Sequence, residues 1–287
     1  MALTFEKRPG VADIINTKGQ RKLTMLTAYD APTARIAEAG GVDMILVGDS
    51  VAMTMLGRPD TNSVTLDEMI YHAALVVAVA KRSMVIGDMP FLSYEISPET
   101  ALENAGRYFR ESGVRAVKVE GGRIIAPQVR ALTLAGIPVI GHLGLTPQRA
   151  AMLGGFKAQA RTAKDAGNLL EDALALQAAG CFALVLECVP APVAKAVTEK
   201  LTIPTIGIGA GPDCDGQVLV FHDMLGLGDF KPKFVKVYAQ LGELARSAVS
   251  DYCREVQDGA FPGPEHCFAM PDDELKAFIN ALGAEPD

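Results

Sequence analysis

The chain of 287 residues is 49% hydrophobic and 21% charged, a composition that excludes a predominantly disordered chain and allows a large folded core. Its 27 Lys and Arg face 34 Asp and Glu, and the net charge of -7 argues against broad binding to nucleic acid or an anionic membrane, so small molecules or other subunits are the expected partners. The N-terminus lacks an apolar signal core and no stretch approaches the ~18 apolar residues of a membrane span, which predicts a cytoplasmic protein.

Eight apolar runs along the chain have the character of buried β-strands. They read as nearly continuous Val, Ile and Leu, which is typical of parallel strands covered on both faces. Helical patterns alternate with them and predict βαβ units with right-handed crossovers. The fold class predicted is therefore α/β, a (β/α)8 TIM barrel, because eight is the strand number of that fold. The runs cover residues 23–30, 43–50, 83–90, 115–122, 137–144, 181–188, 203–210 and 217–223.

The segments between these runs contain the signals that begin and end helices. Thr65 and Glu68 have the spacing of a capping box, and Ser97 followed by Pro98 has the pattern of a helix start. Amphipathic patterns after about residue 230 predict extra C-terminal helices. We expect one domain over residues 1–287, with the barrel at about 22–228 and a helical extension at about 229–287. The helices predicted within the barrel cover residues 31–40, 65–81, 97–113, 124–135, 162–180 and 191–200.

Five of the predicted strands end on residues that can do chemistry. In a parallel barrel the carboxyl ends of all strands lie on one face, which is the face that carries the active site. The sequence therefore predicts one pocket rich in carboxylates. Its candidate residues are Asp49, Ser50, Asp88, Lys118, Glu120, His142 and Glu187.

Asp49 and Asp88 follow neighbouring strands, where their oxygens can share a divalent cation. Mg²⁺ suits this set because it is a hard ion that takes one or two protein carboxylates and leaves positions for substrate and water. Glu120, one strand further, can ligate directly or through water. The alternative is that these acids cap helices or pair with Lys118.

The other polar strand ends suggest substrate binding and proton transfer. Lys118 and Glu120 flank one residue, so both side chains point to the same side of their strand. His142 can donate a hydrogen bond to a substrate carboxylate or oxyanion, or it can be structural. Glu187 ends an apolar run and is a candidate general base, although it can instead cap the helix that begins after Pro190.

Ten motifs, in order along nearly the whole chain, are similar to those of a known family. The chain resembles the ketopantoate hydroxymethyltransferases, which belong to the phosphoenolpyruvate/pyruvate barrel superfamily. A series of this length is far more specific than any one motif. The motifs are LTAYDAPTA, ILVGDS, VTLDEMIYH, GDMPF, VKVEGG, GHLGLTPQ, GGFKAQ, FALVLECVP, IPTIGIGAGPDCDGQVLVFHDMLGL and FPGPEHCF.

The resemblance implies a particular reaction and assembly. It implies a (β/α)8 barrel that uses Mg²⁺ to transfer a hydroxymethyl group from methylenetetrahydrofolate to 3-methyl-2-oxobutanoate, giving 2-dehydropantoate in pantothenate biosynthesis. The partners implied are the 2-oxo acid and the folate, and the assembly implied is a homo-oligomer, a decamer built from rings.

The resemblance also implies roles for individual residues. Asp49 and Asp88 would ligate the metal, with Glu120 as a ligand or just outside the ligands. The two aspartates, Ser50, Lys118 and His142 would form the substrate site, in which Ser50 and Lys118 contact the substrate carboxylate. Glu187 would be the catalytic proton acceptor.

Near the second strand the chain departs from the family pattern, with Val51-Ala52-Met53 in place of Leu-Gly-Met and Asn62-Ser63 in place of Leu-Pro. None of these departures removes a proposed catalytic group. Two other functions are compatible with the residues. One is another Mg²⁺-dependent 2-oxo acid carbon–carbon lyase of the same superfamily, and the other is a catalytically idle barrel that serves as a binding module.

Overall fold

A closed barrel of eight parallel strands forms the centre of the protein, in a computed structural model that describes residues 8–228 and 232–283. The strands follow one another around the barrel in chain order, and β8 pairs with β1 to close it. The predicted fold class is confirmed. The strands are β1 (Leu23–Thr27), β2 (Met44–Val47), β3 (Met84–Asp88), β4 (Ala116–Glu120), β5 (Val139–Gly144), β6 (Ala183–Glu187), β7 (Thr205–Ile208) and β8 (Gly216–Leu219).

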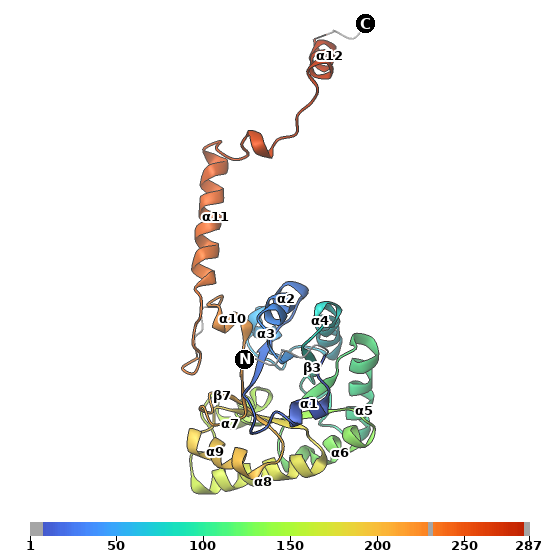
Figure 1. The fold of residues 1–287 in the computed structure, drawn as a ribbon, viewed down its shortest axis with the longest axis vertical. Coiled ribbons are helices and arrows are strands. Elements are labelled where there is room, and N and C mark those ends of the chain that lie inside the picture. Colours follow the sequence, from blue (N-terminus) through green and yellow to red (C-terminus); the bar gives the residue numbers. More distant parts are fainter. Residues whose placement is uncertain (1–7, 229–231, 284–287) are drawn as a thin grey trace. The chain divides into compact units, whose positions relative to one another are not determined.

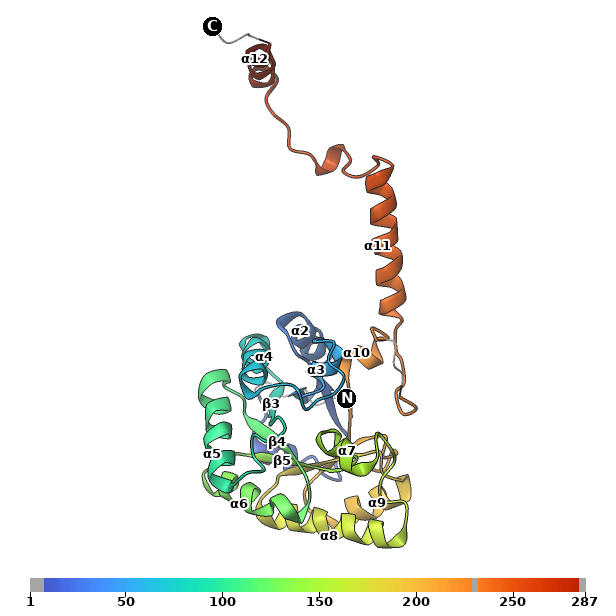
Figure 2. The same cartoon turned by 180° about the vertical axis from the view of Figure 1, so that it is seen from behind.

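Helices surround the barrel and pack against the outer face of its strands (Figures 1 and 2). All six helices predicted within the barrel are present, although a π-helical turn, η1 (Tyr108–Ser112), continues one of them. Among the described residues, no helix is both long and apolar enough to cross a membrane. The six helices are α2 (Ala31–Ala39), α4 (Leu66–Val79), α5 (Pro98–Arg107), α6 (Ala126–Leu134), α8 (Ala163–Ala179) and α9 (Ala191–Lys200).

The predicted helix starts are confirmed by hydrogen bonds. Thr65 Oγ1 accepts from Glu68 N at 3.3 Å, and Glu68 Oε2 accepts from Thr65 N at 2.8 Å, which completes the capping box of α4. Ser97 Oγ accepts from Thr100 N at 3.2 Å at the start of α5. These bonds satisfy amide groups that have no partner within the helix, so the sequence determines where the two helices begin.

Side chains that alternate along each strand fill the interior of the barrel. Met84 and Ile86 of β3 point inward, and Asp88 continues their row at the carboxyl end. In β4 the row begins at Ala116 and reaches Lys118 and Glu120. The apolar lower layers therefore place the polar strand ends inside the barrel mouth.

Several short elements had no prediction. Helix α1 (Val11–Ile15) packs Ile14 against the apolar interior cluster of the barrel. The predicted last strand, 217–223, is partly wrong because the strand ends at Leu219 and residues Phe221–Met224 form helix α10. The other short elements are α3 (Val51–Thr54), η2 (Arg123–Ile125), η3 (Pro147–Arg149) and α7 (Ala150–Leu153).

The chain divides into two compact units, one ending at Ala239 and the other beginning at Gln240. The second unit contains the predicted C-terminal helices, α11 (Leu241–Gln257) and α12 (Asp272–Leu282), with the short turn η4 (Pro264–His266). Apolar side chains are exposed on both helices. The expectation of a single domain with an extension from about residue 229 stays a prediction.

Candidate active site

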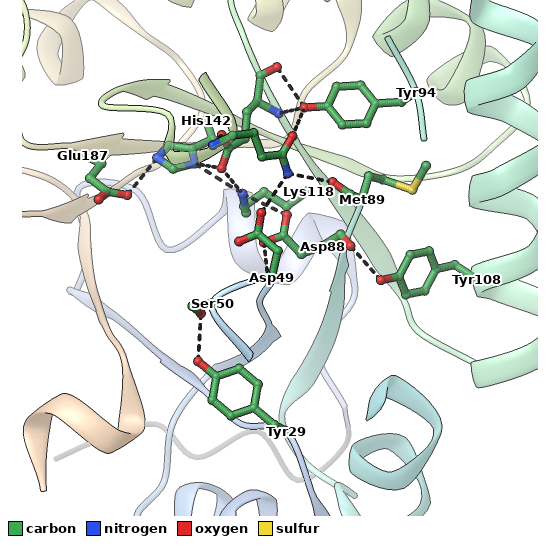
Figure 3. Close-up of polar contacts among 12 residues, drawn as sticks. Tyr29, Asp49, Ser50, Asp88, Met89, Tyr94, Tyr108, Lys118, His142 and Glu187 are labelled. Carbon is green, nitrogen blue, oxygen red and sulfur yellow. Dashed lines mark hydrogen bonds and ion pairs between the residues drawn. The ribbon is translucent and has the colours of Figure 1, made fainter. Parts of the chain in front are cut away.

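Strand register brings most of the predicted polar residues into one cluster. Asp88 of β3 is paired with Lys118 of β4, and Glu120 of β4 is paired with His142 of β5. Because these residues all point into the barrel, register neighbours become side-chain neighbours. The resulting arrangement, called here the polar cluster, consists of Asp49, Asp88, Lys118, Glu120, His142 and Glu187, of which Figure 3 labels all but Glu120.

Asp49 and Asp88 lie side by side at the ends of β2 and β3, and both are buried. The backbone N–H of Asp49 donates to Asp88 Oδ2 at 3.0 Å. The other oxygen, Asp88 Oδ1, forms an ion pair with Lys118 Nζ at 2.8 Å. Within the part of the chain that the structure describes, Asp49 Oδ1 accepts no hydrogen bond, so one carboxylate oxygen of this pair remains available to a ligand.

His142 lies between two carboxylates. Its Nδ1 is 3.1 Å from Glu120 Oε1, and its Nε2 is 3.2 Å from Glu187 Oε2. The second contact is an ion pair only, because Nε2 makes no hydrogen bond of acceptable geometry with the described residues. An acceptor at each ring nitrogen favours the imidazolium form.

Opposing effects determine the protonation of the cluster. Burial raises the pKa of Asp49 well above its usual range, and the charges of Asp88 and Glu120 raise it further. Burial also raises the pKa of Asp88, although Lys118 partly offsets this. For Glu120, burial acts in the same direction, but Lys118 and His142 outweigh it and lower the pKa to about 2. The cluster thus contains one strongly ionised carboxylate and two that are crowded by like charge.

Gln148 is the main site residue that the sequence did not reveal. It is buried, and its Nε2 donates to Asp49 Oδ2 at 2.9 Å and to the carbonyl of Met89 at 3.0 Å. Its Oε1 accepts from the Tyr94 hydroxyl at 2.8 Å, and its backbone N–H donates to Glu120 Oε2 at 3.2 Å. Gln148 therefore holds carboxylates from two different strand ends in fixed positions.

In the sequence only the family motif GHLGLTPQ, which ends on Gln148, marks this residue, and neither composition nor spacing assigns it to the site. It lies in the turn η3, four residues beyond Gly144 at the end of β5. One of the departures from the family pattern contacts it, because Asn62 Nδ2 donates to the Gln148 carbonyl at 3.1 Å. A leucine or proline side chain at position 62 has no such donor, so this chain has an additional contact between two loops of the site.

Two further buried tyrosines, Tyr29 and Tyr108, form hydrogen bonds with residues of the site. The hydroxyls of Tyr29 and Ser50 are 2.8 Å apart, and the Tyr108 hydroxyl donates to the backbone carbonyl of Asp88 at 2.6 Å. Gly87 permits the second contact, since a Cβ there would lie 2.6 Å from the Tyr108 ring. Ser50 thus lines the cavity, and among the described residues its hydroxyl bonds to Tyr29 and to none of the charged groups of the cluster.

A cavity of about 1310 Å³ opens at the carboxyl ends of the strands, and all seven predicted site residues line it. Ligand pockets for single small molecules usually measure about 300–1,000 Å³, so this cavity is large enough for more than one small substrate. Its walls also include apolar side chains and the helix α10 that follows β8.

We expect His142 to make the stability of the protein depend on pH. Burial and Lys118 disfavour its charged form, but the charge of Glu120 and contacts with Glu120 and Glu187 outweigh them and raise the pKa to about 9. This stabilisation is complete below pH 6.5, the ordinary pKa, and is lost as the pH rises through about 9. Urea unfolding between pH 6 and 10 should show this loss, and His142→Gln should reduce the slope. Equal slopes in both proteins would contradict it.

The closed parallel barrel, with charged side chains converging in a cavity at its carboxyl face, defines a (β/α)8-barrel enzyme. A family model described as ketopantoate hydroxymethyltransferase matches residues 9–264. The chain belongs to the ketopantoate hydroxymethyltransferase family and is a hydroxymethyltransferase.

Similar proteins in two bacteria carry the same name. The 3-methyl-2-oxobutanoate hydroxymethyltransferase of Nitratidesulfovibrio vulgaris is 61% identical over 272 residues, which cover 94% of this chain and 89% of the relative. The one of Oleidesulfovibrio alaskensis is 60% identical over 276 residues and covers 96% of each chain.

Solved structures with low sequence identity share the fold. A phosphonopyruvate hydrolase in complex with oxalate and Mg²⁺ has a TM-score of 0.61 at 14% identity, with 95% of each chain covered. A phosphoenolpyruvate phosphomutase from Streptomyces platensis subsp. rosaceus has a TM-score of 0.59 at 17% identity, with 96% of each chain covered. At these identities the likeness concerns the fold alone.

Proposed function

We propose that the chain transfers a hydroxymethyl group from methylenetetrahydrofolate to 3-methyl-2-oxobutanoate, giving 2-dehydropantoate for pantothenate synthesis. The observation that carries this proposal is the placement of Glu187 and the Asp49–Asp88 pair in one cavity large enough for two substrates. Family membership supports the same reaction.

The donor set of the cluster fits a divalent cation. Its four carboxylates face two cationic side chains, so a bound Mg²⁺ would balance the charge if all six groups are ionised. Among the described residues no three His, Cys, Asp or Glu side chains form a ready-made metal group. Asp49 and Asp88, whose carboxylates lie side by side at the barrel mouth, would hold the ion as two protein ligands, with substrate and water completing the shell. The structurally similar phosphonopyruvate hydrolase was solved with oxalate and Mg²⁺, which supports this choice.

Glu120 would lie outside the metal's direct ligands. Its Oε1 contacts Lys118 Nζ at 3.0 Å and His142 Nδ1 at 3.1 Å, while its Oε2 accepts from the backbone of Gln148. Because its Oε1 contacts both cationic side chains of the cluster, Glu120 would orient Lys118 and His142 and act on the ion through water or charge.

The 2-oxo acid would be held by groups that can face its anionic end. Lys118 Nζ has three N–H donors, of which two are directed to Asp88 and Glu120. It also lies 3.3 Å from His142 Nδ1, which cannot accept as part of an imidazolium, so the third N–H would reach a substrate carboxylate. Ser50 lines the same cavity and has a hydroxyl that can donate. His142, as an imidazolium, would add positive charge at this end. When bound, Mg²⁺ would supply Lewis acidity toward the 2-oxo group.

Glu187 would remove the C3 proton of the 2-oxo acid. His142 Nε2 lies 3.2 Å from its Oε2, and Oε1, which has no hydrogen bond or ion pair with the described residues, would take the proton. The C3–H electron pair then forms the enolate, whose C3 attacks the one-carbon unit of the folate. The two bonds between this carbon and the folate nitrogens break, and water supplies the hydroxyl oxygen of the product. The nitrogens take up one proton from water and the one held by Glu187, so the folate leaves as tetrahydrofolate.

The proposal predicts a reaction that requires both the folate and a divalent ion. With 3-methyl-2-oxobutanoate, methylenetetrahydrofolate and Mg²⁺, we expect 2-dehydropantoate by mass spectrometry. Removal of metal by EDTA should abolish turnover, and added Mg²⁺ should restore it. No product in the complete mixture would contradict the proposal, and cleavage of 2-oxo acid adducts without folate would favour the lyase alternative.

We also infer that the chain acts as a homodecamer in the cytoplasm. The assembly implied by the family resemblance supports the decamer. The exposed apolar side chains of the C-terminal unit support self-association, since contiguous exposed apolar surface is typical of interaction sites. They include Leu244, Val249, Tyr252, Phe278 and Ile279.

A further inference from the structure

The cavity has a second carboxylate wall, which the reaction at the polar cluster does not use. Helix α10 follows β8, and its Asp223 lines the same cavity as Glu187. Asp223 is half-buried, and within residues 8–228 and 232–283 its side chain makes no hydrogen bond or ion pair. A carboxylate removed from water without a partner is unfavourable, so this position calls for a ligand that donates hydrogen bonds.

Among the residues that the structure describes, none donates a hydrogen bond to the Asp223 carboxylate. The charge of Asp223 acts on the Tyr29 hydroxyl, whose pKa it helps to raise, but that hydroxyl pairs with the Ser50 hydroxyl at 2.8 Å. The His222 ring packs against Tyr29 with ring centroids 5.5 Å apart. Burial raises the pKa of Asp223 to about 6, which agrees with a carboxylate that has no cationic partner among the described residues.

The charge and hydrogen-bonding capacity of Asp223 favour one of the two substrates over the other. A 2-oxo acid is an anion and carries no N–H donor, so a second carboxylate would repel it. The pteridine ring of a folate presents an amino group and a ring N–H side by side, and these match the two oxygens of one carboxylate. The apolar residues Met53, Leu219 and Leu227 line the same cavity and can cover the faces of a flat ring.

We propose that Asp223 binds the one-carbon donor, with its two carboxylate oxygens accepting hydrogen bonds from the amino and ring N–H groups of the pteridine. The proposal rests on the proposed function, because it names the position of the folate within that site. It puts the donor on the α10 wall and the 2-oxo acid at the polar cluster, so that the one-carbon unit lies between them.

The test measures the two substrates separately. In Asp223→Asn, one acceptor oxygen is replaced by a donor, and in Asp223→Ala both acceptors are removed. Loss of a hydrogen bond to a charged group corresponds to about 10- to 100-fold in affinity, so we expect the KM for methylenetetrahydrofolate to rise by about that factor. The KM for 3-methyl-2-oxobutanoate should change less than twofold.

A second readout requires no folate. With Mg²⁺ alone, wild type should exchange the C3 hydrogen of 3-methyl-2-oxobutanoate for solvent deuterium, and both Asp223 variants should do so at the wild-type rate. This result would also show that the variants are folded. Glu199→Ala, which removes an exposed acid from α9, is the matched control and should leave both substrates' kinetics unchanged.

Three results would overturn the proposal: an unchanged KM for the folate, equal losses in exchange and transfer, or a lower kcat with both KM values unchanged. Failure of the proposed function would look different, because wild type itself would then yield no 2-dehydropantoate.

Discussion

Replacing Glu187 by glutamine is expected to lower kcat about 10²- to 10⁴-fold, the usual contribution of a positioned general base. Glutamine keeps the size of the side chain but cannot accept the C3 proton. His142 lies 3.2 Å from one carboxylate oxygen and contributes to the orientation of the group, so binding of the 2-oxo acid should change only modestly. Steady-state kinetics with both substrates measures the two effects.

A control for this variant is available in the next residue. Cys188 lines the same cavity but has no role in the proton transfer proposed here, so Cys188→Ser should keep kcat within a few-fold of wild type. Turnover of Glu187→Gln at the wild-type rate would assign the base to another residue. A large rise in KM with unchanged kcat would instead make Glu187 a binding group.

Lys118→Met is expected to have the largest effect on stability. The Lys118 ammonium is buried between Asp88 Oδ1 at 2.8 Å and Glu120 Oε1 at 3.0 Å. Removal of one partner from a buried ion pair leaves uncompensated charge, which costs about 3–5 kcal/mol. We therefore expect the free energy of unfolding to fall by that amount near pH 8, measured by urea unfolding at one protein concentration.

At acidic pH, the difference in the free energy of unfolding between wild type and Lys118→Met should become smaller. In wild type, the lowered pKa of Glu120 contributes stability that is present above pH 4.5 and is lost as the pH falls through about 2. Without Lys118 the carboxylates bind protons more readily, so the variant should gain relative stability as the pH falls. Lys195→Met, at an exposed position on α9, is the matched control and should have little effect at any pH. A Lys118 variant as stable as wild type at pH 8 would contradict the ion-pair account.

The strands could be predicted because buried parallel strands have an unmistakable composition. Each is a short apolar run, and period-two alternation then predicts that Lys118 and Glu120 share a side. Since all carboxyl ends meet on one face of a barrel, the sequence also predicts that the polar strand ends converge. The structure brings them to one cavity, while the catalytic roles of the individual residues stay predictions.

The other features of the site are contacts between side chains that lie far apart in the sequence, and local sequence patterns do not predict such contacts. The contact of His142 with both Glu120 and Glu187 depends on the register of three strands. Gln148 reaches Asp49 across 99 positions of the chain, and the family motif GHLGLTPQ that ends on it does not indicate this contact. The sequence predicts too late an end for β8, because the apolar run continues into α10, where Phe221 is buried like a strand residue.

Solvent exchange at C3 of 3-methyl-2-oxobutanoate tests the central claim most directly. In D₂O with Mg²⁺ and no folate, proton NMR should show that wild type removes the C3 methine signal and collapses the methyl doublet to a singlet. Glu187→Gln should leave both signals unchanged over the same period. Exchange by the Glu187 variant at the wild-type rate, or none by a wild type that forms 2-dehydropantoate, would contradict proton abstraction by Glu187.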